Sequence, residues 1–302
     1  MTEQIERLAE QLRRAGLRSG DCVVMVLPNG LEFLVIFLAL ARAGLIVAPL
    51  NTAYKADELR IFFEDIQPGA IIVGSSNSAV LDAAAGRSLP IWQSFVESSG
   101  AIGLKGLPEL SPSVAGNPGG DDFALLMHTS GTTSRPKGVP LTHTNVLRST
   151  FNIATHYALT SADRSLVVMP LFHGHGLIGA ALATLASGGT AIIPSRFSAS
   201  QFWDLFRRHG ATWYTAVPTI HEVLLERADR DGAPASGPRF IRSCSAALAP
   251  AVLANLEKRF GAPVLEAYGL TEAAHQVASN PLPPRPHKPS SVGFGTGVEI
   301  AI

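Results

Sequence analysis

The sequence predicts an α/β protein in which mainly parallel β-sheets are wrapped by helices. Short apolar runs alternate with helical patterns along almost the whole chain of 302 residues. Such alternation is typical of parallel strands that crossover helices connect. The composition agrees, because 46% of the residues are apolar and only 16% are charged, which excludes a disordered chain.

The first half opens with a helical pattern over residues 3–15 that Gly16 ends, followed by an apolar run at Cys22–Leu27 that predicts a buried strand. The further elements predicted here are a helix at 31–43, a strand at 45–49, a helix from about Ala56 and a strand at 70–73. Residues 107–121 are rich in Pro, Gly and Ser and predict an exposed linker. We therefore expect a first α/β subdomain over 1–106 and a second over 122–302.

The second half shows the same rhythm more clearly. Strands are predicted at 123–127, 165–168, 190–193, 212–216, 240–243 and 263–267, and helices at 142–158, 175–187, 199–208, 218–228 and 250–259. In a mainly parallel sheet, ligands gather beyond the carboxyl ends of the strands. Motifs that follow these strands are therefore the candidates for a site.

Charge and cysteine content exclude several function classes. The 24 basic and 24 acidic residues cancel, which removes the basic surface expected of a nucleic-acid-binding protein. Cys22 and Cys244 lie far apart, so neither a disulfide framework nor a structural zinc site is expected. The most apolar window, Leu31–Leu50, contains Glu32 and Arg42 and is interpreted as a buried helix and strand rather than a membrane span. No secretory signal opens the chain, and a cytoplasmic location is expected.

A loop rich in hydroxyl groups follows the strand predicted at 123–127. Its candidate ligand-binding residues are Thr129, Ser130, Gly131, Thr132, Thr133, Ser134, Lys137 and Gly138. Hydroxyls and free backbone N–H groups can surround phosphate oxygens, and lysine supplies a mobile positive charge. Composition alone also allows a solvated Ser/Thr/Gly loop. A Walker A loop is disfavoured, because Pro136 stands where glycine is needed and Gly138 follows the lysine instead of Ser or Thr.

Four further segments occur in a defined order after this loop. They are Pro170–Gly176 (PLFHGHG), Ser243–Leu248 (SCSAAL), Glu266–Glu272 (EAYGLTE) and Ser291–Gly295 (SVGFG). Together with the loop TSGTTSRPKG, they resemble the signatures of the adenylate-forming superfamily of AMP-binding enzymes and acyl-CoA synthetases. The match covers nearly the whole chain. The resemblance implies the fold of the large N-terminal domain of an acyl-CoA synthetase.

The resemblance also implies a reaction. ATP and a carboxylic acid form an acyl-adenylate and pyrophosphate, and coenzyme A then accepts the acyl group. The loop with Lys137 would bind the phosphates, and Ser245 and Ala246 would lie beside the adenine. Glu266, Ala267, Tyr268 and Gly269 would complete the nucleotide site, with Tyr268 offering a flat face for stacking and Gly269 allowing close backbone approach.

The pair Thr271 and Glu272 offers a hydroxyl and a carboxylate suited to a phosphate and its Mg²⁺; the alternative is an ordinary helix cap. His173 would hydrogen-bond the reacting carboxylate or border its pocket, although a lone histidine is also often structural. Lys137, Thr271, Glu272 and His173 are thus the candidate catalytic residues. Tyr268, taken alone, is more often an ordinary core tyrosine at a strand end.

Details of the motifs resemble the oxalate–CoA ligase branch. Ser134 stands where glycine is more usual, and the strings Arg242–Ala246 and Thr271–His275 agree with that branch. A small dicarboxylate would need a compact polar pocket, for which His173, Ser245 and His275 are the candidate donors. A ligase for a fatty or aryl acid is the alternative, as is an adenylation domain that loads a carrier-protein thiol.

The resemblance also implies parts that do not occur before Ile302. These are an aspartate for the ribose, a hinge, and a C-terminal lid that carries a lysine. We therefore expect the chain to be the large N-terminal domain of a ligase. The alternative is a nucleotide-binding remnant with little or no catalytic activity.

Overall fold

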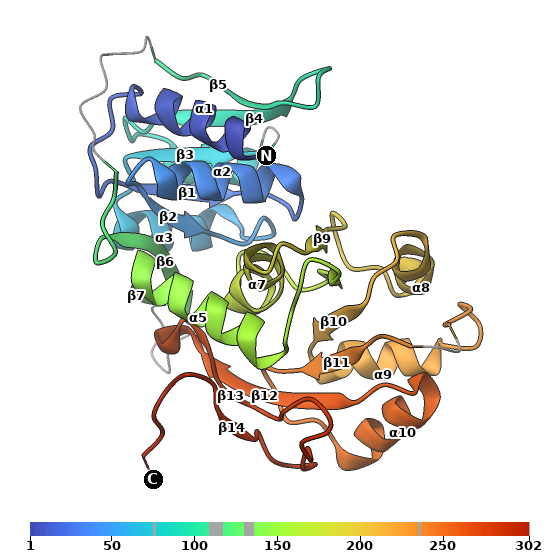
Figure 1. Cartoon of the computed structure of the whole chain (residues 1–302). Coiled ribbons are helices and arrows are strands. Elements are labelled where there is room, and N and C mark those ends of the chain that lie inside the picture. The colour runs from blue at the N-terminus through green and yellow to red at the C-terminus, as the bar shows by residue number, and fades with distance from the viewer. Residues whose placement is uncertain (75–76, 109–116, 130–135, 235–236, 302) are drawn as a thin grey trace. The chain divides into compact units, whose positions relative to one another are not determined.

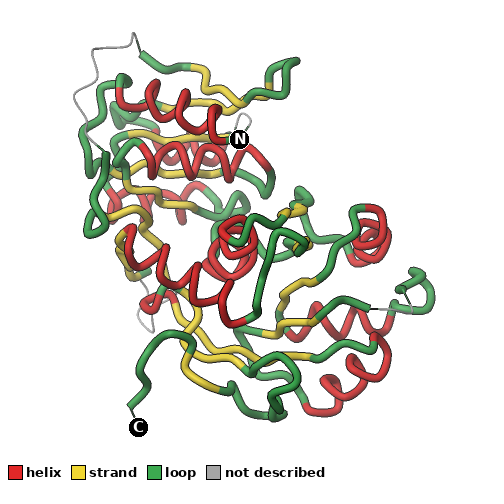
Figure 2. Tube along the Cα trace, viewed as in Figure 1, coloured by secondary structure: helices red, strands yellow, loops and turns green. Residues whose placement is uncertain are grey.

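Contacts divide the chain into two compact units, Met1–Val146 and Leu147–Ile302. The computed structural model describes residues 1–74, 77–108, 117–129, 136–234 and 237–301. The division falls inside helix α5, which spans His143–His156. Each unit contains one sheet with helices packed along it (Figures 1 and 2).

Unit 1 is built on a seven-stranded sheet with the order β5-β4-β3-β1-β2-β6-β7. Its elements are α1 (Thr2–Arg13), β1 (Cys22–Val26), α2 (Leu31–Arg42), β2 (Ile46–Pro49), α3 (Ala56–Ile66), β3 (Ala70–Val73), α4 (Ser78–Ala84), β4 (Ile91–Val96), β5 (Ile102–Lys105), β6 (Phe123–Thr129) and β7 (Lys137–Thr142). The central pairs from β4 to β6 are parallel, whereas β5 and β7 pair antiparallel at the two edges.

Both faces of this sheet are covered. Val24 and Val26 of β1 belong to a buried cluster with residues of α3 and α4, such as Phe63 and Val80. Because side chains alternate along a strand, Met25 faces the other way, and it is fully buried as well. Helices α1 and α2 pack beside each other (Figure 1). Burial on both sides explains why these strands are continuous apolar runs.

Unit 2 contains a second seven-stranded sheet, with the order β14-β13-β12-β11-β10-β8-β9. Its elements after α5 are β8 (Arg164–Leu166), α6 (Gly174–Gly176), the π-helical turn η1 (Leu177–Leu182), α7 (Ala183–Ala186), β9 (Thr190–Ile192), α8 (Ala199–Arg208), β10 (Trp213–Ala216), α9 (Pro218–Glu226), β11 (Phe240–Ser243), α10 (Pro250–Phe260), β12 (Val264–Leu270), the 3₁₀ turn η2 (Thr271–Ala273), β13 (His275–Ser279) and β14 (Phe294–Gly295). The pairs from β9 to β12 are parallel, and β13 and β14 extend the sheet antiparallel.

One face of this sheet packs against α8, α9 and α10. Tyr214 and Ile241 lie on that face, in one apolar cluster with Trp203, Leu224 and Phe260. Alternation along β10 and β11 sends the neighbouring residues to the opposite face. That opposite face carries polar side chains, which become important for the site.

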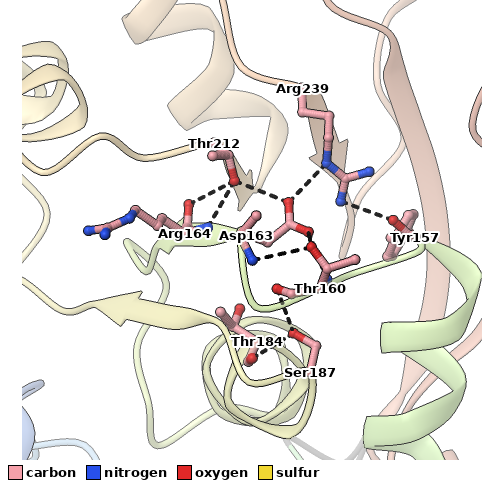
Figure 3. Close-up of polar contacts among 9 residues, drawn as sticks. Tyr157, Thr160, Asp163, Arg164, Thr184, Ser187, Thr212 and Arg239 are labelled. Atoms are coloured by element: carbon pink, nitrogen blue, oxygen red, sulfur yellow. Dashed lines mark hydrogen bonds and ion pairs between the residues drawn. The ribbon is translucent and has the colours of Figure 1, made fainter.

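The amino ends of three parallel strands in unit 2 are joined by a polar network (Figure 3). Asp163 precedes β8 and is almost fully buried. Its Oδ1 accepts hydrogen bonds from Arg239 Nε at 2.9 Å and Thr212 Oγ1 at 3.2 Å, and its Oδ2 accepts from the Thr160 N–H at 2.8 Å. Arg239 Nη2 also donates to the carbonyl oxygen of Tyr157 at 3.0 Å. The Asp163 network therefore ties β8, β10 and β11 together at the end opposite to their carboxyl termini.

The predicted fold class, mainly parallel sheets with flanking helices, is confirmed. The predicted helices and strands also occur close to their expected positions, but the predictions did not include α4, β4, β5, β7, β13 or β14. The domain division differs from the expected one, because residues 123–142 form β6 and β7 of the first sheet. Strand pairing, which local sequence does not determine, places these residues in unit 1. Part of the expected linker at 107–121 lies outside the described residues.

Within the described part of the chain, no helix is both long enough and apolar enough to span a membrane. The window Leu31–Leu50 forms α2 and β2, as expected. Cys22 and Cys244 are both free thiols. Burial raises the pKa of Cys22 to about 12, so this thiol stays protonated and unreactive.

Candidate functional site

In unit 1, the residues on either side of the predicted phosphate loop form an antiparallel hairpin. Thr129 ends β6 and pairs with Lys137 at the start of β7, while Gly138 pairs with His128. The Lys137 side chain is exposed. The predicted ligand residues Ser130, Gly131, Thr132, Thr133 and Ser134 lie outside the described residues.

A buried histidine anchors the end of this hairpin that adjoins the loop. The His128 side chain is only 5% exposed, and its Nε2 lies 3.0 Å from Asp65 Oδ2 of α3. Its ring also meets the ring of Phe62 edge-on, with the ring centres 5.0 Å apart. These contacts fix the end of β6 to α3, and thus fix where Thr129 stands.

In unit 2, the motif residues that follow β11 and those of β12 line one cavity of about 680 Å³. Its lining consists of Ser245, Ala246, Ala247, Leu248, Ala249, Pro250, Glu266, Ala267, Tyr268, Gly269, Ser290 and Val292. This volume is typical of sites for small molecules. The structure therefore brings together six of the residues predicted to bind the nucleotide.

Tyr268 is not a core residue, because 51% of its surface is exposed. Its neighbour Gly269 sits at an irregularity in the pairing of β12 with β13. A Cβ atom on Gly269 would collide with the carbonyl oxygen of His275. The glycine is thus required for the close approach of two strands, which differs from the expected approach to a ligand.

Ser245 has an unusual backbone conformation for a residue with a side chain, with a φ of 74°. Residues other than glycine rarely adopt this region, and those that do are frequent at functional sites. Ser245 is exposed and lines the cavity. The turn after β11 therefore presents its hydroxyl at the cavity wall.

Thr271 and Glu272 form the start of the 3₁₀ turn η2. The cap of this turn is Leu270, without a side-chain hydrogen bond, so the helix-cap alternative is not supported. Glu272 is exposed and forms no hydrogen bond or ion pair with another described residue. Its carboxylate is therefore available to a ligand or an ion.

The two histidines of the segment 170–176 differ sharply. His173 is exposed, and its ring contacts Phe172. His175 is buried, and its Nδ1 lies 3.1 Å from Ser245 Oγ. The ring of His175 stacks on that of His275 at 5.3 Å between centres. Ser245 and His275 are thus brought together by His175, and not by the predicted His173.

Both of these buried histidines are held neutral. Burial, and next the positive charge of Arg242, lower the pKa of His175 and of His275 well below 6.5. Neutral imidazoles accept a hydrogen bond on one nitrogen and donate from the other. Near neutral pH this pair therefore carries one donor and one acceptor on each ring.

Comparison with known proteins assigns the chain to a family. A family model described as AMP-binding enzyme matches residues 1–302. The chain belongs to the AMP-binding enzyme family. An oxalate–CoA ligase from Arabidopsis thaliana is 44% identical over 310 residues, which cover 99% of this chain and 60% of that protein. A sulfoacetate–CoA ligase from Cupriavidus necator is 38% identical over 98% of this chain and 58% of its own length.

A solved structure confirms the fold expected of an AMP-binding enzyme. The structure of MatB from Rhodopseudomonas palustris matches with a TM-score of 0.82 and 29% identity, covering 98% of this chain and 59% of MatB. The chain thus spans about three fifths of the length of the relatives that it matches.

Three buried polar residues in contact with Ser245, with His275 or with one another were not among the predicted site residues: His175, Thr215 and Arg242. His175 stands in a segment already singled out, and only its burial distinguishes it from His173. Arg242 interrupts the apolar strand β11, which is the one signal that could have revealed it. Thr215 gave no signal in the sequence.

Proposed function

We propose that this chain is the ATP- and carboxylate-binding part of an acid–thiol ligase that forms an acyl-adenylate. The observation that carries the proposal is the cavity of unit 2, where an exposed Tyr268 ring and the unusual Ser245 turn stand at one wall. The family membership and the names of the relatives support the same activity.

In the proposed first half-reaction, a carboxylate oxygen of the acid attacks the α-phosphorus of ATP. The acyl–AMP bond forms, and the bond to pyrophosphate breaks. In the second, the sulfur of coenzyme A attacks the acyl carbon, and AMP leaves. The first step crowds negative charge, so its catalyst needs cations and hydrogen-bond donors rather than an activated nucleophile.

Each predicted residue has a role in this scheme. Tyr268 stacks on the adenine, with Ala246, Glu266 and Ala267 beside it, and Thr271 donates to a phosphate. Lys137 of unit 1 and the loop that precedes it are the proposed phosphate-binding residues. The Lys137 side chain is exposed and flexible, which suits an ammonium that must follow negative charge as the phosphates react.

Magnesium fits the carboxylate of Glu272. The described residues contain no group of three or more His, Cys, Asp or Glu that could hold a metal alone. Nucleotide sites commonly bind Mg²⁺ through one or two carboxylates together with phosphate oxygens. The ion would neutralise phosphate charge there, while Glu272 holds it in place.

A small acid with two charged groups is the proposed substrate, and oxalate is the first candidate. Oxalate and sulfoacetate, which name two of the relatives, are both two-carbon dianions. The polar cluster of Ser245, His175 and His275 suits such an acid better than a long apolar one. A ligase for a fatty or aryl acid is the second candidate, and binding of nucleotide without catalysis is the third.

Carboxylate-dependent exchange of pyrophosphate into ATP tests the proposal directly. The chain is assayed with oxalate, sulfoacetate, a medium-chain fatty acid and benzoate. We expect exchange with the two dianions, and a loss of about 100-fold in Glu272→Gln, the size expected when one charge-stabilising group is removed. Glu222→Gln, an exposed glutamate on α9, is the matched control and should exchange normally.

The outcomes separate the three candidates. Exchange with the fatty acid or benzoate but not with the dianions would replace the proposed substrate class. Binding of ATP without exchange on any acid would favour the non-catalytic alternative. In unit 1, Lys137→Ala should also abolish most exchange, whereas Lys105→Ala, another exposed lysine of that unit, should not.

A further inference from the structure

Arg242 is fully buried in the middle of β11 and faces away from the apolar cluster of α8, α9 and α10. Its guanidinium contacts four polar side chains. Nε lies 3.0 Å from Tyr157 Oη and 3.1 Å from Gln276 Oε1, Nη1 lies 2.9 Å from Thr215 Oγ1, and Nη2 lies 2.9 Å from both His275 Nε2 and Gln276 Oε1. These four partners are neutral at pH 7, and the Cys244 thiol also lies beside the guanidinium.

A buried charge without an opposite partner is exceptional. The guanidinium remains protonated in proteins, and removing it from water is costly unless a negative group compensates. Arg242 forms no ion pair with any carboxylate of the described residues. No carboxylate of the described residues therefore balances the charge of Arg242, and an anion bound nearby would do so.

The proton positions follow from what each group can donate. Arginine only donates, so the His275 Nε2 contact makes that nitrogen the acceptor and places the proton of His275 on Nδ1. Thr215 Oγ1 likewise accepts from Arg242. Thr215 is 1% exposed, and the one other partner of its hydroxyl among the described residues is His175 Nε2 at 2.6 Å.

This leaves one arrangement in which the shared protons of Thr215 and His175 both have an acceptor. The Thr215 hydroxyl donates to His175 Nε2, because otherwise its hydrogen would be buried without an acceptor, at a considerable cost. His175 then carries its proton on Nδ1 and donates it to Ser245 Oγ. With that lone pair occupied, the Ser245 hydroxyl hydrogen is free to point into the cavity that Ser245 lines.

We propose that Arg242 is a positioning residue for the anionic acid. It orients a chain of hydrogen bonds that runs through Thr215 and His175 and ends with the Ser245 hydroxyl as a donor at the cavity wall. This inference rests on the proposed function insofar as the ligand is a carboxylate. The recognised class is an acid of high negative charge density, since a hydroxyl donor at the cavity wall and a buried cation without a carboxylate partner both favour it.

Two features of the backbone support this assignment. Ser245 maintains its positive φ although a glycine would adopt it more easily, which indicates that its hydroxyl is needed. Gly179, in the π-helical turn η1, packs so closely that a Cβ atom would collide with the His275 ring. Turns of this kind are frequent at functional sites. Here the turn packs directly against the His275 ring, on the side where that ring contacts Arg242.

The first test is the tautomer of each histidine, measured by long-range ¹H–¹⁵N spectra of the chain labelled with ¹⁵N-histidine at pH 7. We expect His175 and His275 to be neutral and protonated on Nδ1. A proton on Nε2 of His175, or an imidazolium at either residue, would overturn the proposal. This readout does not depend on catalysis, so it stands even if no acid supports exchange.

The second test compares two buried threonines of unit 2. Thr215→Val breaks the chain of donors, whereas Thr184→Val removes an equally buried hydroxyl that bonds Ser165 and the carbonyl of Ala180. We expect Thr215→Val to raise the KM for the dianion about tenfold, with the KM for ATP unchanged and the His175 tautomer altered. Thr184→Val should change neither.

Equal effects of the two threonine variants would mean that only packing is at stake, and would contradict the proposal. If the Thr215 variant does not fold, Ser245→Ala tests the same chain, because Ser245 is exposed and its replacement should not disturb folding. It should raise the KM for the dianion by a similar factor and leave the His275 tautomer unchanged. An unchanged KM in Ser245→Ala would overturn the proposed direction of the chain.

Discussion

Arg239 and Arg242 lie close together in the sequence, yet the charges of these two arginines are treated in opposite ways. Arg239 stands before β11 at the amino ends of the parallel strands, and Asp163 neutralises it at 2.9 Å (Figure 3). Arg242 lies within β11, closer to the carboxyl ends, and no carboxylate of the described residues pairs with it. The two arginines differ in whether a carboxylate compensates their charge, and this difference distinguishes the structural end of the sheet from the proposed binding end.

The largest effect is expected where the compensated pair is broken. Asp163→Ala removes the acceptor for Arg239, Thr212 and the Thr160 N–H. We expect the free energy of unfolding to fall by about 3 kcal/mol, at the low end for a buried pair because Arg239 is partly exposed. Urea titration measures this loss, and the KM for the acid should not change.

Asp204→Ala is the matched control for that loss. Asp204 pairs with Arg208 on the surface of α8, and an exposed pair of this kind contributes about 0.5 kcal/mol or less. Equal losses in the two variants, or a rise in the KM of Asp163→Ala, would contradict the division of roles between the two ends.

Acidification tests the histidines that unit 2 holds neutral. Burial lowers the pKa of His221 from 6.5 to about 4. The unfolded chain therefore binds this proton more tightly, so stability is lost as the pH falls from 6.5 towards 4. His221→Phe should make the loss in unfolding free energy between pH 6.5 and pH 5 smaller by about 1.5 kcal/mol, because one histidine contributes up to about 1.4 kcal/mol per pH unit and is already half protonated in the unfolded chain at pH 6.5.

Urea titrations of the His221→Phe variant and the unaltered chain at the two pH values decide this point. An identical loss in both proteins would show that His221 is not held neutral. Arg242 is unchanged in this variant and still lowers the pKa of His175 and of His275. These two histidines should therefore still take up protons in acid, and the KM for the acid should still depend on pH.

Periodic elements could be predicted from the sequence, whereas pairings could not. Buried strands such as β1 and β3 are short apolar runs bounded by breakers, and α8 has a clear apolar face, so local pattern suffices for them. The strand β7 contains Pro140 and Gly138, which disfavour a strand, and it is tolerated because it lies at a sheet edge. The unit boundary within α5 depends on β6 joining β2, a contact between residues far apart in sequence.

The candidate site shows the same limit. Tyr268, Glu272 and Ser245 could be singled out because they stand in contiguous motifs. Arg242 could not be understood from the sequence, since a charged residue is normally expected at the surface. Its partners come from the turn that follows α5, from β10 and from β13, and only the folded chain brings them to one point.

The smallest expected effect comes from the same substitution made at both arginines. Arg239→Lys keeps a charge beside Asp163 and loses mainly the hydrogen bond from Nη2 to the Tyr157 carbonyl, so it should reduce the unfolding free energy by only about 0.5–1 kcal/mol. Arg242→Lys also keeps the charge, but an ammonium cannot reproduce the fixed fork that reaches Thr215 and His275 together. It should therefore raise the KM for the dianion several-fold, which Arg239→Lys should not do. If both lysine variants bound the dianion as the unaltered chain does, positive charge alone would account for recognition, and the directed hydrogen bonds would be unnecessary.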